Sequence, residues 1–232
     1  NGQATLTNTT LSGNTARGGL GGGAGSGISG GGENGQGLGG GLFNLNGQVS
    51  VNSGTIAFNR ADQGGGGVFN LGYLGADGTQ CTAGSCPTAS VTLVNSILSN
   101  TPTIAGTGAA VTDLVSSRPA QVATGAANLV PSDVNVADHN IVRSSAALGG
   151  SITGTPSPAD PGLAALANNV PSSPTPPFTP PATHAITNTS PAYNTGATSL
   201  ATDERGVARP SLGQTDIGAF ELVPTTATIA YT

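Results

Sequence analysis

The sequence predicts an all-β chain folded as a right-handed parallel β-helix, and three observations carry that prediction. The motif GGGLFNL at residues 39–45 returns as GGGVFNL at residues 65–71, which is 26 residues later. Residues 3–16 line up with residues 48–61 at an offset of 45. No window shows the sustained i, i+3, i+4 apolar stripe of a helix. Repeats of this period are typical of solenoids, in which each short unit buries its apolar face against its neighbours.

The repeated unit ends in an asparagine. The offset of 45 places Leu6 on Val51 and Leu11 on Ile56, and a third copy runs over residues 91–100. We expect a ladder of side-chain amides at the closing position of each unit, formed by Asn14, Asn59 and Asn100, with Asn140 as a candidate fourth member. The successive asparagines lie 45, 41 and 40 residues apart. If one coil takes roughly 20–26 residues, each of these intervals holds either two coils or one coil with an insertion.

Each unit has strand chemistry surrounded by turn chemistry. Short alternations such as residues 5–7 and 49–51 contain β-branched and apolar residues, and Gly, Asn, Ser and Asp bound them. The two glycine triplets suit turns with positive φ and close backbone approach. The glycine-rich residues 17–41 are expected to hold at least one coil inside a long loop. A phosphate-binding loop is excluded there because no Gly-Lys-Ser/Thr is present.

The composition favours a neutral, hydrogen-bonding surface. Only 7% of the residues are charged, the net charge is −5, and lysine is absent. The 36% of apolar residues, regularly spaced, argues against disorder. The lack of a basic cluster argues against nucleic-acid binding. No segment is apolar enough to predict membrane insertion. Because the chain begins within a repeat and has no signal peptide, we expect a fragment of a longer secreted protein.

Residues 72–90 read as an insertion between coils, and we expect any ligand here. Tyr73 and Asp77 are the predicted ligand-binding residues, with an unspecialised surface bulge as the alternative. Cys81 and Cys86 are predicted to form a local disulfide, which implies an oxidising, extracellular compartment. The alternative is a pair of free thiols.

Two further features of the coils have competing interpretations. Phe43 and Phe69 occupy the same repeat position, and we expect them to stack inside the core, with a sugar-stacking platform as the alternative. Asp138 and His139 are adjacent, and a histidine beside an aspartate can act as a catalytic base. They lack a recognisable nucleophile, so His139 is interpreted as a turn residue.

The chain is predicted to divide into four parts. Residues 1–150 form the β-helix coils, and the proline-rich residues 151–182 pack along the outside because proline cannot donate to a central strand. Residues 183–224 form a C-terminal cap, and residues 225–232 form an exit strand or linker.

The tail also carries a family resemblance. It reads DPGL at 160–163, THA at 183–185, SPAYNTG at 190–196, TDERGVARP at 202–210 and DIGAFE at 216–221. This series closely resembles the choice-of-anchor Q domain of large bacterial surface proteins, with Tyr193-Asn194 and Glu204 as departures. The resemblance implies a right-handed β-helix of the pectate-lyase-like superfold at a cell surface. It implies no activity.

Most charges of the C-terminal third gather in the same motifs. We expect arginine–carboxylate pairs to fix the final strand over the last coil, since a solenoid end needs covering. Calcium binding or catalysis by an acid pair are the alternatives. The predicted cap residues are Asp203, Glu204, Arg205, Arg209, Asp216 and Glu221.

The sequence therefore predicts a non-catalytic extracellular module with a structural, adhesive or self-assembling role and no cofactor. Its expected partner is a polysaccharide, another cell-surface component or further copies of the chain end to end. The first alternative is a carbohydrate-binding module centred on Tyr73. The second is a polysaccharide lyase or hydrolase, which would need acids from different coils to converge.

Overall fold

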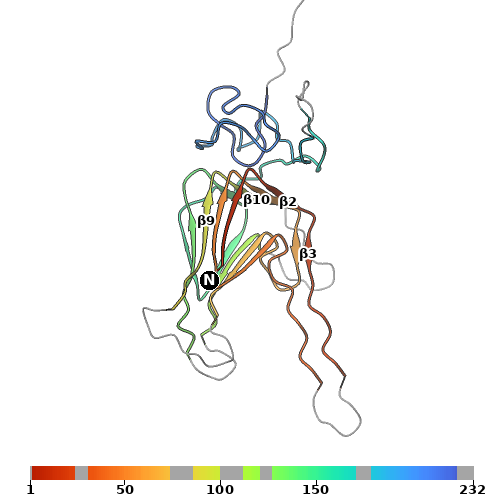
Figure 1. Cartoon of the computed structure of the whole chain (residues 1–232), viewed down its shortest axis with the longest axis vertical. Coiled ribbons are helices and arrows are strands. Elements are labelled where there is room, and N and C mark those ends of the chain that lie inside the picture. The colour runs from red at the N-terminus through yellow and green to blue at the C-terminus, as the bar shows by residue number, and fades with distance from the viewer. Residues whose placement is uncertain are drawn as a thin grey trace, which may run out of the picture.

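The chain is a parallel β-helix (Figure 1). The computed structural model describes residues 2–23, 31–73, 86–99, 112–120, 127–170 and 179–223. Every regular element in these ranges is a β-strand, and all the paired strands run parallel. The same ranges contain no helix with the length and hydropathy needed to cross a bilayer. The prediction of a parallel β-helix is confirmed.

Three long sheets and one short sheet run along the stack. The five-stranded sheet consists, in order, of β1 (Gln3–Thr7), β5 (Gln48–Asn52), β9 (Ala89–Val94), β12 (Ser132–Val136) and β15 (Ser151–Thr153). The β2 sheet consists of β13 (Ile141–Val142), β10 (Ile97–Ser99), β6 (Thr55–Ala57) and β2 (Thr10–Ser12). The β4 sheet consists of β14 (Ser145–Leu148), β11 (Leu114–Ser117), β8 (Val68–Leu71) and β4 (Leu42–Leu45). The short sheet pairs β3 (Thr15–Ala16) with β7 (Arg60–Ala61).

Both repeat offsets are strand registers. Leu6 pairs with Val51 and Leu11 with Ile56, so the offset of 45 is a single turn of the helix. Phe43 pairs with Phe69 at the offset of 26. The 45-residue interval is therefore one coil that carries a long insertion, rather than two coils.

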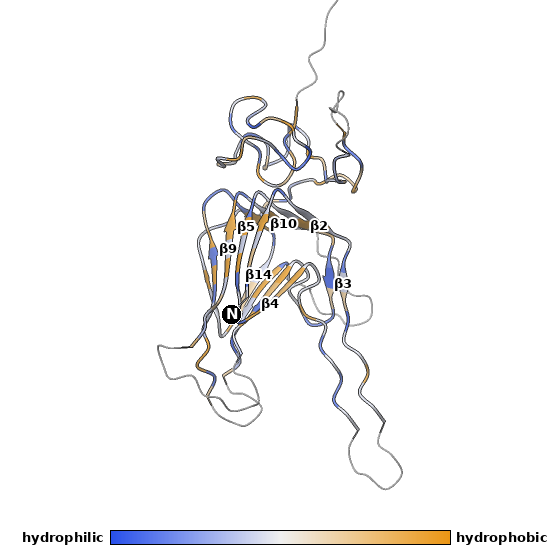
Figure 2. Ribbon diagram, in the orientation of Figure 1, coloured by the Kyte–Doolittle hydropathy of each residue, from blue (hydrophilic) through white to orange (hydrophobic). Residues whose placement is uncertain are grey.

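Alternation along the strands builds the core. In β9 the side chains of Ala89, Val91 and Leu93 are fully buried, and the residues between them are only partly buried. The inward side chains of successive coils form one apolar cluster, which includes Val51, Ile56, Val68, Leu98, Leu114, Val134 and Val142. Figure 2 shows this apolar character along the stacked strands. The core runs the length of the stack, as expected for a quasi-one-dimensional solenoid.

A buried ladder of polar side chains lies beside this core. Asn44 donates to Oδ1 of Asn70 at 2.6 Å, and Asn70 donates to the Ser132 hydroxyl and to the Ala89 carbonyl at 3.0 Å each. The Ser116 and Ser132 hydroxyls lie 2.9 Å apart. Buried polar groups need hydrogen-bond partners, and these amides find theirs on the neighbouring sheet. Their hydrogen bonds therefore connect the β4 sheet to the five-stranded sheet.

We predict that Asn70→Ala lowers the free energy of unfolding by about 1–3 kcal/mol, because it leaves the buried Asn44 amide and Ala89 carbonyl without this partner. Asn135→Ala is the matched control, since Asn135 is exposed on strand β12. Urea titration followed by circular dichroism measures both changes. Equal stability of the two variants would contradict the proposed role of the buried ladder.

The predicted ladder at the end of each unit is described in part. Asn14 donates from its side chain to Oδ1 of Asn59 at 3.0 Å, and Asn59 donates to the Leu11 carbonyl at 2.8 Å. Asn100 lies outside the described residues. Asn140 lies in a different place, because it precedes β13 and accepts a hydrogen bond from the backbone N–H of Ser96. Asn140 therefore lies at the start of a strand, whereas Asn14 follows the end of β2 and Asn59 follows the end of β6.

The glycine-rich residues form an arm instead of the expected coil. The described residues 17–23 and 31–37 contain no strand, and they run antiparallel as a projection from the body (Figure 1). The N–H groups of Gly32 and Gly35 donate to the carbonyls of Gly22 and Gly19 at 2.8 Å. A Cβ on Gly21 would lie 1.7 Å from the Gly32 carbonyl oxygen, so the two backbones approach too closely for a side chain. The glycines therefore allow the two segments of this arm to lie close together.

The C-terminal segment, defined here as residues 157–170 and 179–223, lies against the side of the stack. It covers the outward face of the β2 sheet, where Ile97 and Ile141 pack with Ile186, Ile217 and Phe220 (Figure 1). It contacts every coil, through hydrogen bonds to Thr10, Thr55, Asn95 and His139. The expected final strand over the last coil is not seen. Residues 217–222 are irregular, and Gly218 fits closely against Thr55 and Ile97.

The expected part boundaries can be compared with these elements. Strand β15 begins at Ser151, so the coils continue past residue 150. Ser157 bridges to Ile141, and Ala167 bridges to Thr183. Of the proline-rich residues 151–182, the described residues from 157 onward therefore belong to the C-terminal segment and lie against the β2 sheet. Residues 171–178 and 224–232 lie outside the described residues.

Candidate functional site

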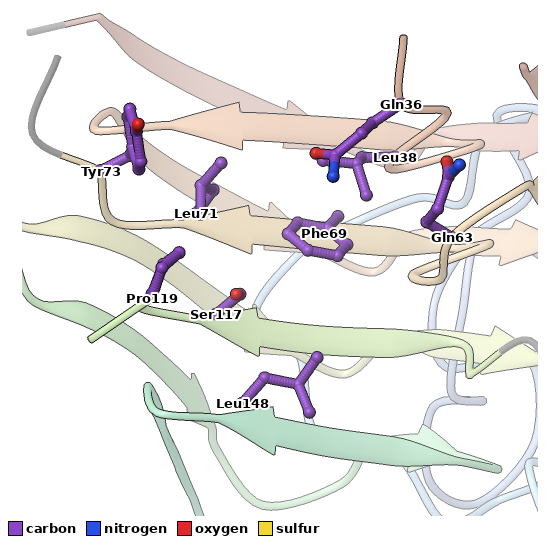
Figure 3. Close-up of a pocket in the computed structure, with 9 residues that line it drawn as sticks. All are labelled: Gln36, Leu38, Gln63, Phe69, Leu71, Tyr73, Ser117, Pro119 and Leu148. Atoms are coloured by element: carbon purple, nitrogen blue, oxygen red, sulfur yellow. The ribbon is translucent and has the colours of Figure 1, made fainter. Parts of the chain in front are cut away.

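A groove lies on the outward face of the β4 sheet (Figure 3). Its volume is about 490 Å³, which is within the range of small-ligand sites. Side chains of β8, β11 and β14 form its floor, and residues from the base of the glycine arm lie beside them. The lining residues are Gln36, Leu38, Gln63, Phe69, Leu71, Tyr73, Ser117, Pro119 and Leu148.

The alternation of β8 explains this lining. Val68 and Asn70 point into the solenoid, so Phe69 and Leu71 point outward, and Tyr73 continues the same row (Figure 3). The expected placement of Phe43 and Phe69 inside the solenoid is therefore wrong, although Phe69 is itself buried, at 5% exposure. Their rings do approach each other, with centroids 6.2 Å apart, but on the outside of the sheet. Asn44 and Asn70 occupy the inward positions, where they form the hydrogen bonds of the buried polar ladder.

The predicted ligand residue Tyr73 lies in this groove on a fixed backbone. Its N–H donates to Oδ1 of Asn46 at 2.9 Å, and its carbonyl accepts from the same amide at 2.6 Å. The preceding Gly72 is held by Ser117 and by the side chain of Asn128. Asp77 and Cys81 lie outside the described residues. Cys86 is disulfide-bonded.

The groove carries no formal charge at neutral pH, because its lining contains no Asp, Glu, Lys, Arg or His. Its polar groups are amides and a hydroxyl. The side-chain oxygen of Gln63 accepts a hydrogen bond from Gly37 N–H, which leaves the NH₂ of Gln63 to donate. The sequence interpretation missed Gln36, Gln63 and Leu148, because nothing in the repeat indicates that the base of the arm meets the β4 sheet.

The predicted cap charges form a buried network in the C-terminal segment. Arg205 donates to Oδ2 of Asp203 from Nη2 at 2.7 Å, and Arg209 donates to Oε2 of Glu221 at 3.1 Å. Arg205 also lies over the ring of Phe220, 3.7 Å from its centroid. The carboxylates accept further backbone N–H groups, including those of Ser211 and Asp216 on Glu221 and that of Val207 on Asp203. Such saturation by donors is typical of a structural network.

Glu204 differs from the other five residues of this network. Its carboxylate accepts hydrogen bonds from the backbone N–H of Thr10 at 3.1 Å and from the Thr10 hydroxyl at 2.5 Å. Burial raises the pKa of Glu204, and the two bonds from Thr10 oppose that change. Glu204 therefore ties the C-terminal segment to the first coil.

His184 makes a second tie of this kind. Its Nδ1 lies 2.7 Å from the Ala164 carbonyl, which requires an N–H there, and its Nε2 accepts from the Ser12 hydroxyl at 2.8 Å. Burial lowers the pKa of His184, so the ring is held neutral against Phe58. His139 lies apart from it, with Nδ1 2.8 Å from the Thr195 carbonyl.

We predict a pH-dependent stability from Asp216, whose pKa burial raises to about 6 from 3.8. The folded chain holds this proton at higher pH than the unfolded chain, so the stabilisation is complete below about pH 4 and is lost as the pH rises through about 6. The stability of the wild type relative to Asp216→Asn should fall across this window by up to about 3 kcal/mol. Urea titrations at several pH values measure the difference, and a pH-independent difference would contradict it.

The acids of the coils are also used structurally. Asp62 accepts a hydrogen bond from Gly18 N–H, Asp113 from the Ser144 hydroxyl, and Asp133 from the Ser151 hydroxyl. Each bond joins neighbouring coils. No cluster of three His, Cys, Asp or Glu side chains suited to a metal ion occurs within the described ranges.

The geometry thus places an uncharged groove on the outward face of the β4 sheet and a buried charge network in the C-terminal segment. The groove has the shape and lining of a binding site, whereas the network holds the C-terminal segment together. No known protein family, curated protein or solved structure matches this chain.

Proposed function

We propose that this chain is a non-catalytic module of an extracellular or cell-surface protein, with a structural and adhesive role. The observation that carries the proposal is the apolar outward face of the β4 sheet. Phe43 is 46% exposed, Leu45 is 51% exposed and Leu148 is 54% exposed, and Leu71 is partly exposed, whereas Phe69 is only 5% exposed. Contiguous exposed apolar patches mark interaction sites on soluble proteins.

The other two long sheets strengthen this interpretation by contrast. The outward face of the β2 sheet is also apolar, and the C-terminal segment covers it. The outward face of the five-stranded sheet is polar, with Gln48, Ser50 and Thr92 among its residues. The β4 sheet differs from both: Phe69 and Val115 are buried on its outward face beside the base of the glycine arm, but the described side chains of Phe43, Leu45 and Leu148 stay exposed there.

An extracellular location is supported by two features. Cys86 is disulfide-bonded, and disulfides persist in oxidising compartments. The tail motifs resemble the choice-of-anchor Q domain of bacterial surface proteins, and we propose that kinship on the motifs alone.

A carbohydrate-binding role is the second candidate, and the groove beside Tyr73 favours it. A lyase or hydrolase is less well supported, because the closest group of acids, Asp203, Asp216 and Glu221, is buried and bonded to arginines and backbone N–H groups.

The test is adsorption of the purified chain to insoluble plant, algal and bacterial polysaccharides and to whole bacterial cells. We expect the chain to leave the supernatant without releasing unsaturated or reducing-end products. Released products would overturn the non-catalytic assignment. A chain that adsorbs to nothing and stays monomeric by light scattering would overturn the adhesive role, whereas filaments in electron micrographs would assign self-assembly instead.

A further inference from the structure

We propose that the groove on the β4 sheet binds a segment of a neutral polysaccharide, an inference that rests on the adhesive function above and names its ligand. The first argument is the floor. Phe69 and Leu71 project from alternate positions of strand β8, and Tyr73 follows two residues after Leu71, so the three side chains form one row in which Phe69 is itself only 5% exposed (Figure 3). Sugar rings have an apolar C–H face that packs on such a row.

The second argument is the polar edge of the groove. Gln36 and Gln63 lie at one side, and Ser117 lies on the floor beside Leu71 (Figure 3). Amide and hydroxyl groups donate to and accept from sugar hydroxyls, and the Gln63 NH₂ is directed by the bond from Gly37 to its oxygen. An apolar floor with a few fixed polar groups is the usual composition of a ligand site.

The third argument is charge. A lining without ionisable acids or bases offers no counter-charge to uronic acids, sulfates or phosphates, so a charged polymer would lose solvation without compensation. The ligand class is therefore neutral.

The fourth argument separates a glycan from a peptide. A peptide that binds by strand addition gains its affinity from main-chain hydrogen bonds to a free sheet edge. Strands β8 and β11, which carry Phe69, Leu71 and Ser117, each pair on both sides, so their part of the groove offers side chains and no free backbone edge. A glycan brings its own hydroxyl groups and needs no such edge.

The site is also held rigid before a ligand arrives. Asn46 fixes the backbone of Tyr73 on both sides, and Asn128 fixes Gly72. Preorganisation of this kind reduces the entropy lost on binding.

The experiment measures the affinity of the full chain for xyloglucan, galactomannan, β-glucan, polygalacturonate and alginate by affinity electrophoresis and calorimetry. Leu71→Ala and Tyr73→Ala should weaken binding to a neutral polymer at least about tenfold. Leu212→Ala is the matched control, because Leu212 is 56% exposed in the C-terminal segment and does not line the groove. Raising the salt concentration should leave the affinity unchanged, since no ion pair contributes.

Four results would overturn the inference: binding to the charged polymers alone, no binding to any neutral polymer, equal losses in Leu71→Ala and Leu212→Ala, or an oligomer that Leu71→Ala dissociates. If the chain binds no neutral polymer but still adsorbs to cells without releasing products, the adhesive function stands and only the proposed ligand is wrong. If the chain releases products, the proposed function itself is wrong.

Discussion

Replacing Glu221 by glutamine is expected to destabilise the C-terminal segment by about 3–5 kcal/mol. Glu221 is fully buried, and its carboxylate accepts from Arg209, from Ser211 N–H and from Asp216 N–H. Glutamine keeps the shape but removes the negative charge and turns one acceptor into a donor. The Arg209 guanidinium would then remain buried without its charged partner. Hydrogen exchange of residues 203–222, read beside a urea titration, measures the loss.

Glu33→Gln is the control for this change, since it removes the same charge from an exposed position on the arm. The double variant Arg209→Met with Glu221→Gln should be less destabilised than Glu221→Gln alone, because no uncompensated charge remains buried. If Glu221→Gln exchanges as slowly as the wild type, the charge network does not hold the segment together.

The second large effect is expected in the core of the stack. Leu93→Ala should lower the free energy of unfolding by about 2–5 kcal/mol, because Leu93 is fully buried in the central strand β9 and its loss leaves a cavity. Leu148→Ala makes the same substitution at a side chain that is 54% exposed, and it should change stability by less than about 1 kcal/mol. Urea titration of the pair is decisive. Similar losses in both variants would contradict the assignment of inward and outward faces.

Much of the stack could be predicted from the sequence because a parallel β-helix places equivalent residues in register. The offsets of 45 and 26 gave the pairs Leu6–Val51 and Phe43–Phe69 directly. The length of a coil could not be fixed, because an insertion between strands leaves the strand register unchanged. The 45-residue interval is one coil for that reason.

The direction of a side chain was harder to predict than its partner. In GGGLFNL, the rule that apolar residues point inward placed Phe43 and Phe69 in the core. The structure directs the adjacent asparagines into the solenoid instead, because Asn70 finds hydrogen-bond partners on the neighbouring sheet. A single strand does not reveal such partners, since Ser132 is 62 residues away.

Part of the candidate site could be predicted for similar reasons. Tyr73 follows a repeat strand directly, and it does line a groove. Gln36 and Leu38 come from the other side of a long insertion, and Leu148 comes from the last coil. Only the stacking of coils brings these residues together, and the sequence carries no signal for it.

The central claim is that the outward face of the β4 sheet is the binding face, and footprinting by hydroxyl radicals tests it most directly. The wild-type chain would be oxidised free and after adsorption to the polysaccharide or cell surface that retains it. We expect protection of Leu71, Tyr73 and Leu148, with no change at Gln48, Thr92 or Leu212. Protection confined to the polar five-stranded sheet or to the C-terminal segment would contradict the claim.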